Sequence, residues 1–224
     1  MINQNHQPPV SIIISYFKKK KFFEETIDSI INQTYQNFEV IVIYDDSDKS
    51  ELDYIKKILK KVRRHKIIVN KKNIGAGPSR NKGAKIANGE YLAFIDSDDL
   101  WSKNKLKKQI TFMKKTQINI SHTSFFIINE DDKFLSKRKA KKKLDYKDLL
   151  NSCDIGLSTV IITKKLFDKY KFSNNKTKED YSLWLKISKN QPIYGLNKNL
   201  TKWRRTNKSL SSNLFQKLID AYLI

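Results

Sequence analysis

The chain has 224 residues, enough for one domain with a full hydrophobic core, so folding needs neither disulfides nor a structural metal. It carries 45 Lys and Arg against 23 Asp and Glu, a formal net charge of +22 at pH 7. Such an excess first suggests nucleic acid or an anionic membrane as partner. Only six of the basic residues are Arg, however, and it is Arg that supplies the planar fork matching phosphate geometry. The charge alone therefore does not identify a partner.

The remaining composition excludes several classes. A single cysteine, Cys153, rules out an internal disulfide framework and a Cys-rich zinc site, and suits a reducing compartment. The three histidines are scattered without metal-ligand spacing. Residues 1–9 lack the basic and apolar regions of a secretory signal, and no apolar run approaches the about 20 residues that span a bilayer. We expect a soluble, cytoplasmic protein.

In the first half, short apolar runs alternate with amphipathic stretches, the pattern of βα units around a mainly parallel sheet. Strands are expected at 10–17, 38–44, 66–70 and 91–96. Helical spacing of apolar residues predicts helices over 23–31 and 52–62, a loop and helix over 75–88, and a helix over 102–113. We expect Gly89 at the C′ position of the third helix and Ser102 as the N-cap of the fourth.

The pattern changes after about residue 117. Strands are expected at 118–129 and 158–163, helices at 144–151 and 178–189, and a basic loop or hairpin at 133–143. We therefore expect one domain over 1–224, made of a nucleotide-binding half at about 8–116, a second half at about 117–213 and a helical tail at 214–224. The apolar residues of this tail suit core packing or membrane contact, and packing is the preferred interpretation.

The strongest chemical signal follows the fourth strand. Asp96, Asp98 and Asp99 place three carboxylates within four residues, where they repel one another unless a cation joins them. Divalent Mg²⁺ or Mn²⁺ takes oxygen ligands and shares them with substrate phosphates. The alternative is an acidic turn that caps the next helix. Because the cluster follows a fully apolar strand, we favour the metal site.

Other polar segments each allow a functional and a structural interpretation. Ser15 and Tyr16 end the first strand, and Asp45 and Asp46 follow the second, where they could accept hydrogen bonds from a base or sugar or simply form a polar turn. The glycine-containing segment 73–83 could favour a diphosphate or be an ordinary loop–helix junction.

Two segments of the second half are equally ambiguous. Glu179 and Asp180 start a helix, where acids complement the helix dipole without any catalytic role. The segment 203–205, Trp-Arg-Arg, offers either exposed cations at a strand end or clamps for phosphate. Neither segment identifies a function by itself.

Taken together, these segments resemble the family 2 glycosyltransferases of bacterial polysaccharide and cell-envelope synthesis. The resemblance covers about 10–213. The matching segments include VSIIISYF at 10–17, SIINQTYQNFEVIVI at 29–43, RNKG at 80–83, GEYLAFIDSDDLW at 89–101, EDYSLWLKI at 179–187 and WRRTNKSLS at 203–211. It implies an α/β, GT-A-like single domain with a mainly parallel, Rossmann-like sheet flanked by helices and a mixed acceptor-side half.

The resemblance also implies a role for each matching residue on the donor side. Asp45 would contact the base, with Asp46 as alternative because YDDSD departs from the usual DDGS. Asp98 would be the main metal ligand, and Asp96 would lie nearer the ribose while also belonging to the metal site. The other residues that the resemblance places near the donor are Ser15, Tyr16, Arg80, Arg204 and Ser209.

For the reaction, the resemblance implies Asp180, beside Glu179, as the catalytic base of an inverting, hexosyltransferase-type enzyme. The enzyme would use Mn²⁺ or Mg²⁺ to move a sugar from a nucleotide-diphospho-sugar, UDP-linked, to a hydroxyl of a glycan or lipid-linked acceptor. Because the QxxRW pattern of processive synthases is absent, we expect transfer of single sugars. Peripheral contact with the anionic inner face of the membrane is a further expectation.

Two rival functions make different demands on the sequence. A nucleic-acid-binding module would interleave aromatic and basic residues, whereas the aromatic residues here lie mostly in apolar strands and helix faces, and the Asp clusters would repel phosphates. We therefore expect no nucleic-acid partner. A non-catalytic scaffold of the same fold would have no need of Asp96, Asp98 and Asp180, which are all present.

Overall fold

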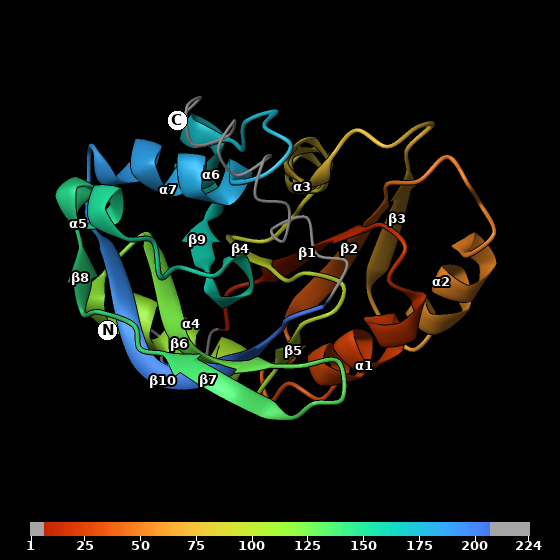
Figure 1. Cartoon of the computed structure of the whole chain (residues 1–224), viewed down its shortest axis with the longest axis horizontal. Coiled ribbons are helices and arrows are strands. Elements are labelled where there is room, and N and C mark those ends of the chain that lie inside the picture. Colours follow the sequence, from red (N-terminus) through yellow and green to blue (C-terminus); the bar gives the residue numbers. More distant parts are fainter. Residues whose placement is uncertain (1–6, 207–224) are drawn as a thin grey trace.

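The computed structural model describes residues 7–206, which form ten strands in one sheet with helices on both faces (Figure 1). The main strand order is β3-β2-β1-β4-β9-β6-β10-β5, with β7 paired to β6 and β8 paired to β10. The strands are β1 Val10–Tyr16, β2 Phe38–Tyr44, β3 His65–Val69, β4 Tyr91–Phe94, β5 Leu100–Trp101, β6 Ile120–Ile128, β7 Phe134–Arg138, β8 Lys143–Leu144, β9 Ile161–Thr163 and β10 Ile193–Arg204. The expected α/β architecture with a mainly parallel central sheet is confirmed.

The helices cover both faces of this sheet. They are α1 Lys20–Ile31, α2 Leu52–Leu59, α3 Ala76–Lys85, α4 Lys105–Thr116, α5 Tyr146–Asn151, α6 Lys164–Tyr170 and α7 Glu179–Ser188, with a 3₁₀ turn at Leu157–Thr159. None of these described helices is long and apolar enough to cross a bilayer. Figure 1 shows α3, α6 and α7 on one side of the sheet and α1 and α2 on the other.

Consecutive isoleucines explain this two-sided burial. Ile12 and Ile14 of β1 pack into the hydrophobic cluster that contains α1, α2 and α4, while Ile13 packs into the cluster on the opposite face with α3, α6 and α7. Successive side chains of a strand point to opposite faces, so an unbroken apolar strand is buried on both. The strands β1 to β4 are parallel, and their carboxyl ends therefore meet at one edge.

The second half extends the same sheet rather than forming a new one. The short strand β9 runs antiparallel to both β4 and β6 and so connects the halves, and β10 runs parallel to β6. The expected strand at 158–163 is half right, because its first residues belong to the 3₁₀ turn. At 133–143 the hairpin alternative is correct, since β7 pairs antiparallel with β6. The long strand β10 and helix α6 were not expected.

Two predicted helix ends are wrong. Ser102 is not an N-cap: its backbone N–H donates to Leu200 O at 3.0 Å and prolongs the β5–β10 pairing, so α4 begins only after Asn104. Gly89 is not at C′ of α3, which already ends at Lys85. Gly89 is instead required for space, because a Cβ there would lie 2.4 Å from the backbone nitrogen of Ser11.

Replacing Gly89 with alanine should therefore destabilise the fold by about 1–3 kcal/mol, since the clashing atom belongs to the backbone of β1 and cannot rotate away. Denaturant unfolding would measure this loss. Gly156→Ala is the matched control, because its Cβ would meet Phe125 at an ordinary 3.6 Å. Equal stabilities for the two variants would contradict the packing argument.

Candidate functional site

The candidate site lies where the parallel strands β1, β2 and β4 end. The register places Tyr16 opposite Tyr44, and the backbone N–H of Asp45 donates to Tyr16 O at 2.8 Å. The acidic loop, defined here as residues 96–99, follows β4 at the same edge. Ligands of open α/β sheets bind at this edge, so the sheet brings the acids after β2 and β4 together.

Asp45 is buried and holds the loop before α3. Its carboxylate accepts hydrogen bonds from Asn70 Nδ2 at 2.8 Å and from the backbone N–H groups of Ile74 and Gly75, both at 2.9 Å. The carboxylate of Asp46 accepts from the backbone N–H of Asp48 at 3.1 Å. Asp45 thus fixes the loop that leads into α3, and contact of either residue with a base stays a prediction.

At the end of β1, the side chain of Tyr16 is fully buried. The Tyr16 ring stacks on Tyr44 with centroids 5.5 Å apart, and its hydroxyl donates to Glu51 Oε2 at 2.5 Å. Burial raises the pKa of the Tyr16 phenol far above its usual range. Ser15 is half-buried. Donor contact by Ser15 or Tyr16 stays a prediction.

Arg80 links the two halves of the chain. Its guanidinium donates to Asp96 Oδ1 at 2.7 Å and to Glu179 Oε1, and lies over the Phe172 ring at 5.5 Å. The side chain is only 5% exposed, so this charge depends on its two carboxylate partners. Arg80 therefore positions the start of α7 against the acidic loop, and an approach to a diphosphate stays a prediction.

Asp180 lies next to Glu179 in the first turn of α7. Burial, assisted by the neighbouring Glu179 carboxylate, raises the pKa of Asp180 to about 7, while Arg80 opposes the shift. One carboxylate oxygen accepts from the backbone N–H of Tyr181 at 2.7 Å. A carboxylate that titrates near neutral pH is suited to accept a proton from a reacting group.

Asp98 faces a cation contributed by the chain itself. Its Oδ2 lies 2.6 Å from Lys19 Nζ, at the loop between β1 and α1. Burial raises the pKa of Asp98, with Asp96 contributing in the same direction and Lys19 opposing it. The ammonium of Lys19 shows that this carboxylate is placed to bind positive charge.

Both carboxylate oxygens of Asp99 accept hydrogen bonds from other parts of the chain. Its Oδ2 accepts from Ser158 Oγ at 2.5 Å and its Oδ1 from the backbone N–H of Arg204 at 2.8 Å. Burial and the adjacent Asp98 and Asp96 hold the pKa of Asp99 well above its usual range. Asp99 therefore has a structural role, and the predicted metal ligands stay Asp96 and Asp98.

Asp96 and Asp98 are the two carboxylates of the acidic loop that remain as predicted metal ligands. Within residues 7–206 no three His, Cys, Asp or Glu side chains gather as a metal site. Mg²⁺, however, is usually held by one or two carboxylates together with substrate phosphates rather than by a full protein cage. The oxygen donors of Asp96 and Asp98, with a cation already drawn to Asp98, fit that kind of site.

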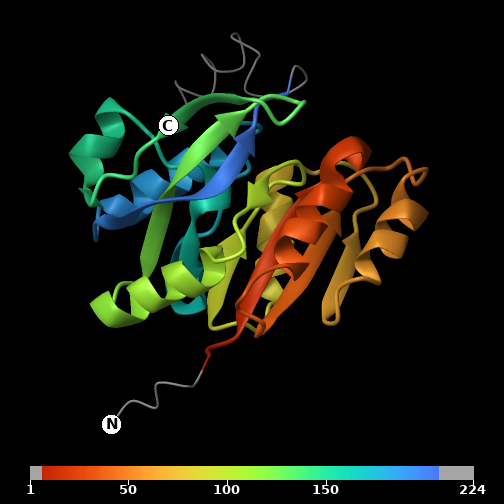
Figure 2. The ribbon, with the colours of Figure 1, turned by 90° about the horizontal axis from the view of Figure 1, so that it is seen from below.

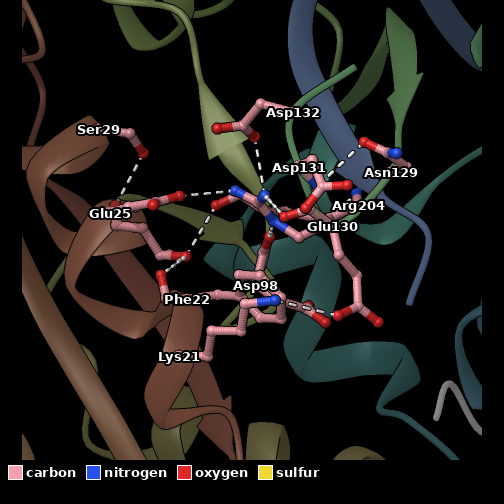
Figure 3. Close-up of polar contacts among 12 residues, drawn as sticks. Lys21, Phe22, Glu25, Ser29, Asp98, Asn129, Glu130, Asp131, Asp132 and Arg204 are labelled. Atoms are coloured by element: carbon pink, nitrogen blue, oxygen red, sulfur yellow. Dashed lines mark hydrogen bonds and ion pairs between the residues drawn. The ribbon is translucent and has the colours of Figure 1, made fainter. Parts of the chain in front are cut away.

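Arg204 is the most heavily bonded side chain at this edge (Figure 3). Its Nε donates to Asp98 O at 2.9 Å, and its terminal nitrogens lie 2.8 Å from the carboxylates of Glu25 and Asp132. The guanidinium also lies 4.5 Å from the centroid of the Phe22 ring.

The side chain of Arg204 is only 1% exposed, so the exposed-cation alternative is wrong for Arg204, whereas Arg205 is exposed. Arg204 joins α1, the acidic loop and the β6–β7 turn, and a role as diphosphate clamp stays a prediction. Ser209, the other residue predicted there, lies outside the described residues.

Sequence reasoning missed two residues of the site. Lys19 stands in a run of four lysines at 18–21, so nothing local marks it as the partner of Asp98. Ser158 begins the strand expected at 158–163, and nothing in its local sequence marks it as a site residue. Its hydroxyl donates to Asp99 and accepts from the backbone N–H of Asp96 at 3.0 Å, so one side chain fixes both ends of the acidic loop.

Comparison with known proteins agrees with this geometry. The sequence profile described as "Glycosyl transferase family 2" matches residues 11–175. The chain is 36% identical over 211 residues to the Escherichia coli protein UDP-Glc:alpha-D-GlcNAc-diphosphoundecaprenol beta-1,3-glucosyltransferase WfgD, a match that covers 93% of this chain and 82% of that protein.

Solved structures share the fold at low sequence identity. TarS of S. aureus (residues 1–349, in complex with UDP) superposes with a TM-score of 0.71 at 23% identity, covering 88% of this chain and 60% of that one. The mannosyltransferase PcManGT from Pyrobaculum calidifontis, in complex with GDP-Man and Mn²⁺, gives 0.74 at 13% identity, covering 98% and 66%. These likenesses identify the fold as GT-A.

Ser158→Ala should destabilise the protein by about 1–3 kcal/mol, because it leaves Oδ2 of the buried Asp99 without its hydroxyl donor and the Asp96 N–H without an acceptor. Chemical denaturation would measure the effect. Ser136→Ala, in the solvent-facing strand β7, should change stability by no more than about 0.5 kcal/mol. A silent Ser158→Ala would rule out this bridging role.

Proposed function

The chain belongs to glycosyl transferase family 2, and from this premise we propose a specific reaction for it. The enzyme transfers a single hexose from a nucleotide-diphospho-sugar, UDP-linked, to a hydroxyl of a lipid-linked glycan, with metal assistance and inversion. The observation that carries the proposal is Asp180: a carboxylate with a pKa of about 7, at the sheet edge where the acids gather.

Asp180 supplies the chemistry of the attacking side. As the acceptor oxygen bonds to the anomeric carbon, Asp180 takes the hydroxyl proton, and the bond from that carbon to the diphosphate oxygen breaks. The nucleoside diphosphate leaves with the bonding electrons. Because attack and departure occur on opposite faces in one displacement, the anomeric configuration inverts.

The donor would lie at the acidic loop. Its metal would be held by Asp98 and Asp96, and a bound Mg²⁺ or Mn²⁺ would offset charge on the leaving diphosphate. Lys19, now paired with Asp98 at 2.6 Å, would lie beside that position. The solved mannosyltransferase complex with Mn²⁺ supports a divalent ion in this fold.

We propose the chemical class of the acceptor from a relative whose name states its reaction. WfgD acts, by its name, on a GlcNAc carried by diphosphoundecaprenol and uses UDP-glucose. We take the same classes for this chain: a UDP-sugar donor and an acceptor glycan on a lipid diphosphate. That assignment supports a place in cell-envelope polysaccharide synthesis, with the enzyme peripheral to the cytoplasmic side of the membrane.

Donor binding should be visible as thermal stabilisation. At a concentration near 100 times Kd, the matching UDP-sugar with Mn²⁺ should raise Tm by about 5–10 °C, because a ligand that binds only the folded state stabilises it. UDP-, GDP- and dTDP-sugars would be screened with and without Mn²⁺. Asp98→Asn should lose the Mn²⁺-dependent part of the shift, whereas Asp131→Asn, an exposed neighbour in the β6–β7 turn, should keep it. If none of these nucleotide sugars raised Tm, the proposal that the protein binds a nucleotide-sugar donor would be contradicted.

Asp180→Asn should lower transfer at least about a hundredfold while donor binding persists, because an amide cannot accept the acceptor proton. In the unchanged protein, transfer should rise with pH through about 7 as the carboxyl deprotonates. Release of UDP with a synthetic GlcNAc-diphospho-lipid acceptor would measure both. Asp168→Asn, an exposed acid of α6, is the charge-matched control. Intact turnover in Asp180→Asn would show that another group is the base.

A further inference from the structure

We infer that the hairpin strand β7 and the segment that follows it form a docking surface for an anionic phospholipid membrane. The segment 133–143 contains seven basic residues and no acid among eleven, whereas the whole chain has 45 basic and 23 acidic residues in 224. Every one of these seven side chains is exposed. The local density of positive charge therefore exceeds what the overall composition requires.

Apolar side chains emerge within the same segment. Phe134 is 62% exposed, the highest value among the large apolar residues that the structure describes as exposed, and Leu135 is 48% exposed. Among the aromatic rings that the structure describes, Phe134 makes a T-shaped contact with Phe126, with centroids 5.7 Å apart. Exposed aromatic and aliphatic residues rimmed by lysines are the composition that inserts into the boundary between headgroups and acyl chains.

A second exposed segment lies beside this one. The β6–β7 turn contacts the start of α1 through Lys21 and Glu130, whose charged atoms lie 3.3 Å apart, and Figure 2 shows the two elements together at one end of the molecule. The loop before α1 adds Phe17, 43% exposed, and the exposed lysines 18, 20 and 21. The basic, aromatic surface thus spans two elements that are distant in the sequence.

The acids of this region are largely neutralised. Between β6 and β7 the turn carries Glu130, Asp131 and Asp132. Glu130 pairs with Lys21, and Asp132 pairs with the buried Arg204 at 2.8 Å. Arg138 and Lys141 in turn pair with Asp154 and Asp148, so the excess positive charge of this surface comes mainly from the other exposed lysines of the segment, 133, 137, 139, 142 and 143. Charge complementarity selects anionic lipid headgroups as the occupant.

The inference rests on the proposed function in one respect, since a lipid-linked acceptor would have to be met at a membrane surface. The same Arg204 that pairs with Asp132 of the β6–β7 turn also donates to the backbone of Asp98. Phe134 and the start of β7 therefore lie at the same edge as the acidic loop, whereas lysines 142 and 143 lie beside the start of β10, at the other end of these strands.

The test is flotation of the full chain with vesicles that contain neither donor nor acceptor. Phosphatidylcholine vesicles would be compared with vesicles containing phosphatidylglycerol, and binding to the latter should be strong and weakened by salt. In the variant K137S/K139S/K142S the partition coefficient should fall about a hundredfold, at about fivefold for each basic residue near an anionic surface. A second variant, F134S/L135S, should also bind more weakly.

The matched control removes the same charge from the opposite end of the molecule. The variant K107S/K108S/K115S alters exposed lysines of α4, which lies far from β7 in Figure 2. It should bind anionic vesicles nearly as well as the unchanged protein. Circular dichroism would establish that every variant is folded before its binding is compared.

Three outcomes would overturn the inference. Equal losses in the hairpin and α4 variants would indicate unspecific attraction by net charge, and absence of flotation would exclude the surface outright. Tighter binding to a duplex DNA or RNA competitor would identify a nucleic-acid partner instead. Because transfer to a short-chain, water-soluble acceptor needs no vesicle, that assay separates failure of the membrane surface from failure of the proposed reaction.

Discussion

The arrangement of this site depends on two buried arginines. A guanidinium taken out of water is tolerable only when carboxylates or carbonyls surround it, and breaking such a pair leaves a costly buried charge. Arg80 meets this demand with Asp96 and Glu179, and Arg204 meets it with Glu25 and Asp132. Each arginine therefore fixes elements from different parts of the chain around the acidic loop between β4 and β5.

This constraint explains why so basic a chain can assemble an acidic site. The carboxylates at the sheet edge would repel one another, but each has a specific neighbour of opposite charge or a hydrogen-bond donor: Lys19 for Asp98, and Ser158 for Asp99. For Asp180, Arg80 and the backbone N–H of Tyr181 offset only part of the effect of burial beside another carboxylate, and its pKa is raised to about 7. Asp180 is the residue for which we propose the role of catalytic base. The surplus lysines lie outside this network, and their densest cluster is on the hairpin.

Much of the fold could be predicted from the residues in order. The strand at 38–44 was placed to the residue, and the alternation of apolar runs and amphipathic stretches identified the parallel half of the sheet. Local periodicity was less informative where strands are short or interrupted. β10 carries polar residues and register shifts against β6, so its pattern does not alternate and it was missed. The helix ends predicted at Gly89 and Ser102 are wrong because both residues contact a neighbouring strand: Gly89 packs against the backbone of β1, and Ser102 donates a hydrogen bond to β10.

The sequence by itself determined the fold class, the sheet edge at which the acids gather, and the family, because strand formation and motif spacing depend on residues close together in the chain. Only the tertiary structure decided what each charged residue does. Arg80 and Glu179 are 99 positions apart, and Arg204 and Asp98 are 106 apart. A lysine in a run of lysines, such as Lys19, gains its partner only when β1 and β4 lie side by side. Burial and pairing arise only when the sheet edge is assembled. For that reason the sequence did not show that Arg204 is buried against Glu25 and Asp132, or that Asp99 accepts hydrogen bonds from Ser158 and the backbone of Arg204.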